Sequence, residues 1–423
     1  MGARSTRGYG PNTNGDAVGE LLQGKDHLLQ GSNNLHEVIV VANTYYTWMY
    51  KESDIRAVHF LLDTIESLRK YMPPTVTTLE KLSSEDDDWW IYYMWIAPGY
   101  KLVVGYDPDK VTPADVIEYV GLSPNNLTLR EGQPFFMLPL MPTREQPMQV
   151  CGFRCNVYRP SIAGIDIFGC CDGCNCPRHG CTLGFIANKA GTNGIVSANH
   201  CIHGSVCNCF GSCCPYNKYV IQPSPICGGT CPSSVIAHDA ITYDFGGGTW
   251  YIDAAFAPAT QPVQYAVLDE GGVIKPLPST FRARDPTPGE SIVKFGRGVY
   301  TFSTRQSTVQ GIGAVVTVCC SPSGGLCRQF GDQIVSGPGY ISSGDSGSGT
   351  YASDLSSAIG LNFAGNIMTG EGIMSRSVLV ERYLGISLAV PSVSTSMLPL
   401  IAGIAAAVGL GIGIVIGTTA PTR

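Results

Sequence analysis

Charged residues are scarce in this chain, and those present form no basic cluster. Only 14% of the 423 residues are Asp, Glu, Lys or Arg, and the formal net charge is -6. Proteins that bind nucleic acid neutralise phosphates with clustered Lys and Arg, and no such run occurs here. The composition therefore argues against a nucleic-acid partner.

The start of the chain has no charged segment followed by an apolar run, so no ordinary secretory signal peptide is expected. Residues 1–34 are polar, contain several Gly and Asn, and are expected to be a flexible N-terminus. At 423 residues the chain is long for a single core, which favours two or three domains.

Cysteine is abundant, and its distribution is uneven. Of the 17 cysteines, 14 lie between Cys151 and Cys231. Such density indicates disulfides in an oxidising compartment or zinc bound by thiolates in a reducing one. The Cys171-x2-Cys174 pair is not repeated at zinc-ribbon spacing, so disulfides are favoured. No cofactor or catalytic metal is expected, and structural zinc in the Cys-rich segment stays an alternative.

Residues 35–140 are expected to form a separate α+β domain whose role the sequence does not assign. Apolar residues at positions 55, 58, 61, 62, 65 and 68 have helical spacing. Pro134 to Pro147 is rich in proline and is interpreted as a linker. The further elements expected are strands at 38–42, 91–96 and 102–104 and a helix at 113–119.

An aromatic cluster lies within this region, formed by Trp89, Trp90, Tyr92, Tyr93 and Trp95. Aromatic side chains dominate protein cores as well as binding surfaces. Core packing is therefore favoured over a binding face. Residues 141–176 follow as a linker and the start of the Cys-rich segment.

Gly344-Asp345-Ser346-Gly347-Ser348 is the stretch with the clearest chemical meaning. Glycine on both sides of Ser346 permits a tight turn that exposes a hydroxyl and aligns backbone amides. A serine hydroxyl is a weak nucleophile until a base takes its proton, so the motif predicts a histidine and an orienting acid elsewhere.

Candidates for both groups occur earlier in the chain. His200 ends an apolar run at Ile195–Ala198 and precedes Cys201. Asp253 lies within an apolar run, where a carboxylate needs a partner such as a histidine N–H. The competing histidines, His203 and His238, and the competing acids, Asp239 and Asp244, lack this context.

The order His200, Asp253, Ser346 is not that of α/β-hydrolases, in which the serine comes first. Instead, the segments Ser197–Cys201, Asp253–Ala257 and Gly344–Ser348 resemble the three catalytic motifs of the chymotrypsin-like (trypsin-fold) serine protease family, closest in pattern to bacterial and viral members. The resemblance covers about half of the chain.

The resemblance implies a mainly β fold with two six-stranded antiparallel barrels at 177–390, joined by a crossing at 277–288. It implies Ser346 as nucleophile, His200 as base and Asp253 as orienting acid, with the amides of Gly344 and Ser346 as oxyanion hole. It also implies a substrate cleft lined by the strand 358–365 and a closing helix at 378–388. The substrate-binding candidates are Tyr340, Leu361, Asn362 and Phe363.

A strand–turn–strand pattern spans residues 181–201, with the turn at Asn188–Gly194. A hairpin of this length would bring Cys181 beside Cys201, and the resemblance implies the same disulfide. One family feature is absent. No Arg precedes an Ile-Val-Gly-Gly-like start, so activation by a freed amine that pairs with Asp345 is not supported.

The segment 397–417 contains no charged residue. At ~1.5 Å per residue, a helix of this length can cross a ~30 Å hydrocarbon layer. We expect a single C-terminal membrane anchor, and Gly409, Gly413 and Gly417 favour helix–helix self-association. The side of the membrane is not defined by the sequence.

The sequence thus predicts a membrane-anchored serine endopeptidase that hydrolyses polypeptides through a Ser-His-Asp triad. The alternative is a non-catalytic, membrane-tethered binding or structural protein, for example of a virus or cell envelope, built on a protease-like barrel. The two differ in whether Ser346, His200 and Asp253 converge.

Overall fold

The structure is a computed structural model that describes residues 52–82, 88–137, 152–176, 179–204, 217–298, 304–320 and 325–391. The described residues up to Ala389 belong to one compact unit. The predicted flexible start at 1–34, the strand at 38–42 and the membrane anchor at 397–417 lie outside the described residues.

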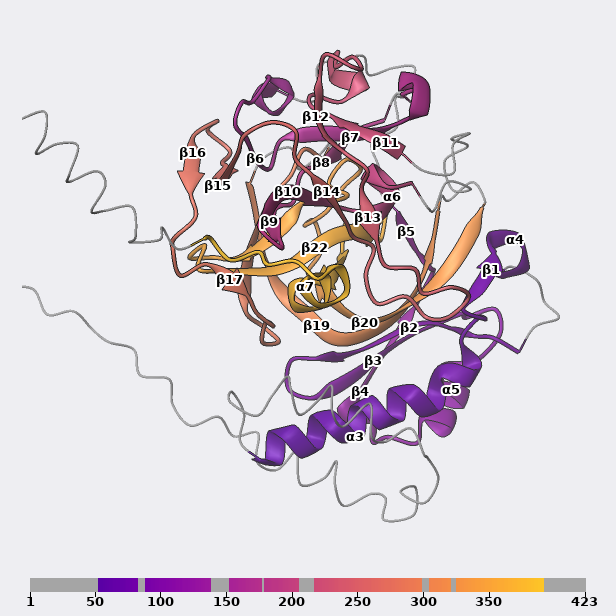
Figure 1. The fold of residues 1–423 in the computed structure, drawn as a ribbon. Helices are drawn as coiled ribbons and strands as arrows, with labels where there is room; N and C mark the ends of the chain where they lie inside the picture. Colours follow the sequence, from indigo (N-terminus) through magenta and orange to yellow (C-terminus); the bar gives the residue numbers. More distant parts are fainter. Residues whose placement is uncertain are drawn as a thin grey trace, which may run out of the picture. The chain divides into compact units, whose positions relative to one another are not determined.

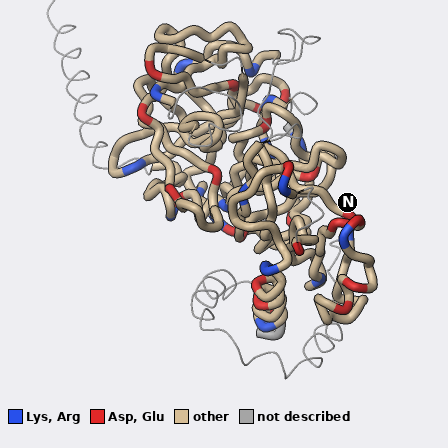
Figure 2. The backbone as a smooth tube through the Cα atoms, turned by 90° about the vertical axis from the view of Figure 1, so that its right-hand side faces the viewer, with Lys and Arg blue, Asp and Glu red and all other residues tan. Residues whose placement is uncertain are grey.

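The fold is mainly β, as expected. Figure 1 shows a few helices among many strands. In the described part of the chain no helix is both long enough and apolar enough to cross a membrane. Basic and acidic residues are interspersed along the backbone rather than gathered in a run (Figure 2).

The N-terminal region contains the elements that the periodicity predicts. Helix α3 (Glu52–Leu68) buries Ala57, Leu61 and Ile65 on one face. Helix α5 (Pro113–Val120) begins after Thr112, whose hydroxyl accepts from the Asp115 amide in a capping box. The other elements are β1 (Val76–Thr78), α4 (Leu79–Leu82), β2 (Ile91–Ala97), β3 (Lys101–Tyr106), β4 (Leu127–Glu131) and β5 (Phe135–Met137).

Strands of this region continue a sheet of the second half of the chain. β2 pairs with β19 (Thr304–Cys319), with Met94 opposite Val315, and β3 and β4 follow outward. Leu61 and Ile65 of α3 share a core with Val315 of β19. The N-terminal region and the second half of the chain therefore share one sheet and one hydrophobic core. The predicted domain boundaries stay a prediction.

The expected linker at 134–147 is wrong for its first residues. β5 follows Pro134 directly and pairs with β19 and with β22 (Ser357–Gly365). The reason is the aromatic run Phe135-Phe136, which is buried and favours a strand despite the preceding proline. Residues 138–151 lie outside the described residues.

The middle of the chain forms three small sheets. Their orders are β13-β14-β10-β9, β12-β11-β7-β8 and β16-β15-β6. The strands are β6 (Ser161–Ala163), β7 (Asp166–Cys171), β8 (Cys181–Thr182), β9 (Phe185–Lys189), β10 (Thr192–Ser197), β11 (Asn217–Ile221), β12 (Val235–His238), β13 (Ile241–Thr242), β14 (Ala255–Pro258), β15 (Val263–Leu268) and β16 (Ile274–Pro276).

The last third forms most of one large sheet. Among the described residues its order is β1-β20-β23-β22-β21-β18-β19-β2-β3-β4, with β5 and β17 paired beside this path. Helix α7 (Ser377–Leu384) follows the final strand where a closing helix was expected at 378–388. The remaining strands are β17 (Arg282–Ala283), β18 (Ser291–Phe295), β20 (Leu326–Ser336), β21 (Gly349–Ala352) and β23 (Gly372–Arg376).

Candidate active site

His200 lies at the end of the predicted hairpin. β9 and β10 pair around Asn188–Asn193, and β10 leads directly into the short helix α6 (Asn199–Ile202), which carries His200. The hairpin is shorter than expected, since Cys181 lies in the separate strand β8, which pairs with β7. The predicted disulfide between Cys181 and Cys201 is present and anchors α6 to β8.

Asp253 is held against His200 by strand pairing. β14 pairs with β10, and Ala255 lies opposite Ser197, so the residues just outside these strands meet. The Asp253 Oδ2 atom contacts Nδ1 of the imidazole. The backbone N–H of His200 donates to Oδ1 at 3.2 Å, and both side chains are fully buried. The carboxylate therefore fixes the ring and the helix turn that carries it.

The competing residues lie elsewhere. His238 pairs with Asp239 on the surface, where their side chains are 45% and 67% exposed. His203 follows α6 and is half-buried, and burial lowers its pKa. Asp244 accepts from the Gly246 amide in a turn. Among these groups, only the His200 and Asp253 pair is buried.

The Ser346 loop lies against the same disulfide. Thr182 of β8 donates its amide to the Ser346 carbonyl oxygen and its hydroxyl to that of Gly344, each at 2.9 Å. The Cys201 sulfur lies 3.8 Å from the Ser346 carbonyl oxygen. The sulfurs of Cys181 and Cys201 also lie within 4.8 Å of a His200 ring nitrogen. One disulfide thus contacts both the histidine turn and the serine loop.

The serine hydroxyl itself contacts the large sheet. Ser346 Oγ donates to the carbonyl oxygen of Phe363 in β22 at 3.2 Å, and the residue is fully buried. Gly347 has a φ of 84°, and a Cβ built there would lie 2.0 Å from the Ser197 hydroxyl oxygen. The loop therefore requires glycine at position 347, as the motif suggested.

The amides proposed for the oxyanion hole differ from their neighbours in hydrogen bonding. Asp345, Gly347 and Ser348 donate to the carbonyl oxygens of Ser342, Asn362 and Asp345. Within the described part of the chain, the N–H groups of Gly344 and Ser346 donate to no protein acceptor. Their role as an oxyanion hole stays a prediction.

The predicted substrate-binding residues are all buried. The Tyr340 hydroxyl lies 2.9 Å from that of Thr350, and the Asn362 amide nitrogen donates to Thr350 and Ser348. Phe363 packs on Phe330 with ring centroids 4.7 Å apart. Leu361 is likewise fully buried. Their role in substrate binding stays a prediction.

Asp345 has a cationic partner that sequence analysis did not assign. Lys294 Nζ lies 2.7 Å from its carboxylate, and both side chains are fully buried. The amides of Gly298 and Ser342 donate to the same carboxylate at 2.9 Å. Burial lowers the pKa of Lys294, and the charge of Asp345 opposes this effect. An internal lysine, rather than a freed amine, therefore forms the ion pair with Asp345.

Removing this lysine should destabilise the fold. Lys294→Met leaves a buried carboxylate without its cation, and breaking such a pair typically costs about 3–5 kcal/mol in free energy of unfolding. Urea denaturation followed by fluorescence measures the loss. The double variant Lys294→Met/Asp345→Asn removes both charges and should recover part of it. An unchanged unfolding midpoint in the single variant would contradict this role.

All twelve described cysteines are disulfide-bonded, and ten of them pair with another described cysteine. The pairs are Cys155–Cys227, Cys170–Cys176, Cys174–Cys231, Cys181–Cys201 and Cys319–Cys327. In the described residues, the two groupings with metal-ligand proximity each include two cysteines of one disulfide. Their sulfurs are not thiolates, which favours the disulfide interpretation. Zinc in the Cys-rich segment stays an untested alternative.

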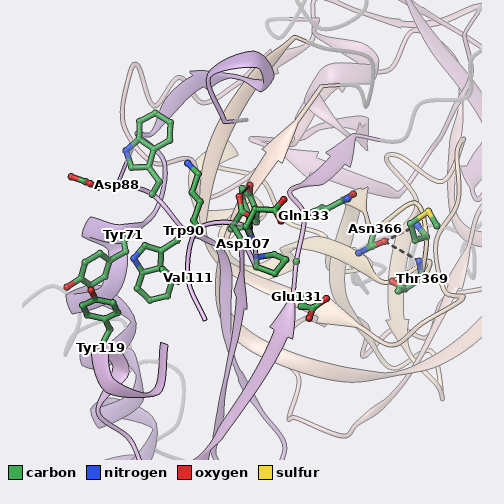
Figure 3. A pocket seen from close by; sticks show the side chains of 17 residues that line it. Tyr71, Asp88, Trp90, Asp107, Val111, Tyr119, Glu131, Gln133, Asn366 and Thr369 are labelled. Carbon is green, nitrogen blue, oxygen red and sulfur yellow. Dashed lines mark hydrogen bonds between the residues drawn. The ribbon is translucent and has the colours of Figure 1, made fainter. Parts of the chain in front are cut away.

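A concavity of about 1370 Å³ lies between the N-terminal strands and the turn after β22. Figure 3 shows Tyr71, Trp90 and Tyr119 grouped on one side, with Asn366 and Thr369 on the other. Of the aromatic cluster, Tyr93 and Trp95 are buried and stack on each other. Trp89 and Tyr92 line the cavity. The cluster thus serves both core and surface.

Comparisons with known proteins give structural neighbours only. No family model matches the chain, and no curated protein matches it. The chain is similar to solved structures of chymotrypsin-like bacterial serine proteases. A glutamic acid-specific serine protease that uses a histidine triad in substrate binding has 17% identity and a TM-score of 0.39, over 54% of this chain and 100% of that one.

Two further neighbours have the same character. Thermobifida fusca protease A has 18% identity and a TM-score of 0.36, over 54% of this chain and 98% of that one. Nocardiopsis protease has 17% identity and a TM-score of 0.36 with the same coverage. The neighbours are therefore trypsin-fold proteases, as the three motifs suggested.

Proposed function

We propose that the protein is a serine endopeptidase that hydrolyses polypeptides, with Ser346 as nucleophile, His200 as general base and Asp253 as orienting acid. The observation that carries the proposal is the buried contact between His200 Nδ1 and Asp253, beside a serine loop docked on the same disulfide. A carboxylate on Nδ1 selects the tautomer whose Nε2 can accept a proton.

The chemistry follows from these positions. Ser346 Oγ attacks the substrate carbonyl carbon while its proton passes to His200. The developing oxyanion accepts hydrogen bonds from the amides of Gly344 and Ser346, each of which typically contributes ~10²-fold or more in rate. His200 then gives its proton to the leaving amine, and water repeats the sequence on the acyl-enzyme. No cofactor takes part in these steps.

The finer architecture belongs to the same proposal. The small sheets around His200 and Asp253 correspond to the first of two six-stranded barrels, and the large sheet around Ser346 to the second. Residues 397–417 would serve as a single membrane anchor and a self-association surface. Liposome flotation of the full chain, compared with a chain that ends at residue 391, tests the anchor.

A non-catalytic, membrane-tethered scaffold is the second candidate. The observation in its favour is the serine hydroxyl, which is fully buried and donates to Phe363 rather than facing solvent. A scaffold would keep the hydroxyl in this hydrogen bond permanently. A protease would release it when substrate binds.

Covalent labelling separates the two candidates. Diisopropyl fluorophosphate forms an Oγ–P bond with an activated serine, fluoride leaves, and the hydroxyl proton passes to the base. Native protein should acquire one modification, mapped by peptide mass spectrometry to Ser346. Urea-unfolded protein serves as control and should acquire none. Absence of labelling in the native protein at neutral pH would favour the scaffold.

A further inference from the structure

Strand β22 has two edges, and the structure identifies which one serves Ser346. On one edge, β23 pairs with β22 from Gly360 to Gly365. On the other edge, Asn362 donates its amide to Ser348 and accepts from Gly347, at 2.9 and 2.7 Å. The nucleophile loop therefore approaches β22 from the edge opposite β23.

Strand β5 occupies the continuation of that same edge. Met137 lies opposite Ala364, and Phe136 lies opposite Gly365, in antiparallel register. Because β23 already pairs with Ala364 and Gly365 on its own side, β5 must lie on the side of the Ser346 loop. The pairing of β22 with β23 shifts register between Asn362 and Ala364, so a bulge separates the residue that contacts the Ser346 loop from those that pair with β5.

An extended polypeptide needs this edge to reach Ser346. The serine hydroxyl lies 3.2 Å from the carbonyl oxygen of Phe363, one residue before Ala364. A substrate whose carbonyl carbon meets the hydroxyl therefore runs beside residues 363–365 and can bind by adding a strand to the sheet. On this edge, β5 pairs with the two residues that follow Phe363, which are Ala364 and Gly365.

We propose that β5 is an intramolecular competitor of the polypeptide substrate, held on the β22 edge that the substrate must use. The inference rests on the proposed protease function and adds its regulation. Apparent substrate affinity is then the intrinsic affinity multiplied by the fraction of molecules in which β5 has left the edge, so it rises when β5 is released. The occupant is a segment of this chain, Phe135–Met137, rather than a separate inhibitor.

Besides its pairing with β19, two further sets of contacts hold β5 in place. Phe135, Phe136 and Met137 are buried, and Phe136 packs with Leu82 in a small core. Just before β5, Arg130 forms an ion pair with Glu371 in the turn between β22 and β23 at 2.8 Å. Glu371 is nearly buried, whereas the Arg130 side chain is 38% exposed. This ion pair links the segment that precedes β5 to the turn that follows β22.

Hydrogen exchange on the wild-type protein tests the inference directly. One sample is treated with diisopropyl fluorophosphate, which has no peptide backbone. A second is treated with a tripeptidyl diphenyl phosphonate, in which the serine displaces phenoxide and the peptide needs the β22 edge. We expect exchange at the amides of residues 135–137 to accelerate at least tenfold with the peptidyl reagent only.

The outcomes separate this inference from the proposed function. If neither reagent modifies Ser346, the protease function fails. If both modify Ser346 and exchange at 135–137 is equal in the two samples, the protease stands and the competing strand is refuted. Displacement by the peptidyl reagent alone supports both.

A variant pair gives a kinetic test. Arg130→Gln removes a partly exposed ion pair, which is typically worth up to ~1 kcal/mol. We expect kcat/KM for an extended peptide to rise about two- to fivefold, with no change for an amino-acid ester too short to pair with β22. Arg282→Gln, at an exposed arginine of β17, is the matched control. An equal rise for ester and peptide would contradict competition at the edge.

Discussion

Replacing Ser346 by alanine is expected to abolish peptide hydrolysis. The hydroxyl supplies the nucleophile, and without it only transition-state binding remains. Loss of a catalytic serine in a triad typically lowers kcat by about 10⁶-fold. Turnover of a fluorogenic peptide, measured at saturating substrate, gives the comparison. Labelling by diisopropyl fluorophosphate should also disappear, because no activated hydroxyl is left.

The matched control lies three residues earlier in the same loop. Ser343 is half-buried and lies outside the contacts described for the site. Ser343→Ala should retain wild-type kcat and labelling. Ser346→Ala should also leave the fold intact, because the substitution removes only the hydrogen bond from the hydroxyl to Phe363. If Ser346→Ala retained activity, the nucleophile assignment would be wrong.

Local patterns predicted the individual elements well. The helical spacing at positions 55–68 corresponds to α3, and the apolar runs at 91–96 and 102–104 correspond to β2 and β3. The disulfide between Cys181 and Cys201, predicted from a hairpin pattern and the family resemblance, is present, although Cys181 lies in β8 outside the hairpin. Such features depend on residues close in sequence, which a single chain reveals through periodicity and turn composition.

Contacts between distant segments were harder to predict. Nothing local in Ile91–Ala97 indicates that β2 pairs with β19, more than 200 positions later. The prolines near Phe135–Met137 led to the linker interpretation, so the strand β5 was not predicted. Its pairing with β22 was not predicted either. These pairings depend on matching edges of a sheet, which one sequence does not encode locally.

The Lys294–Asp345 ion pair was not predicted, although the sequence contains evidence for it. Lys294 lies within the apolar strand Ser291–Phe295, and a buried cation there requires an anion. The sequence analysis also found no freed amine that could pair with Asp345. Joining these two observations would have predicted the Lys294–Asp345 pair before the structure.

Exchanging the Asp253 carboxylate for an amide is expected to lower kcat by about 10⁴-fold at neutral pH, with little effect on stability. The carboxylate accepts from both the ring Nδ1 and the backbone amide of His200. In Asp253→Asn, the amide NH₂ can donate to Nδ1 and select the tautomer whose Nε2 already carries a proton. That nitrogen cannot then take the proton of Ser346.

The chain supplies its own control for this substitution. His238 and Asp239 form a second pair, with Nδ1 and Oδ2 2.6 Å apart, on the exposed surface. Asp239→Asn makes the same chemical change and should leave kcat unchanged. The pair of variants, assayed for peptide turnover and thermal unfolding, separates tautomer control from general charge loss. Equal activity of Asp253→Asn and wild type would show that His200 acts without this carboxylate, because the buried contact would then have only a structural role.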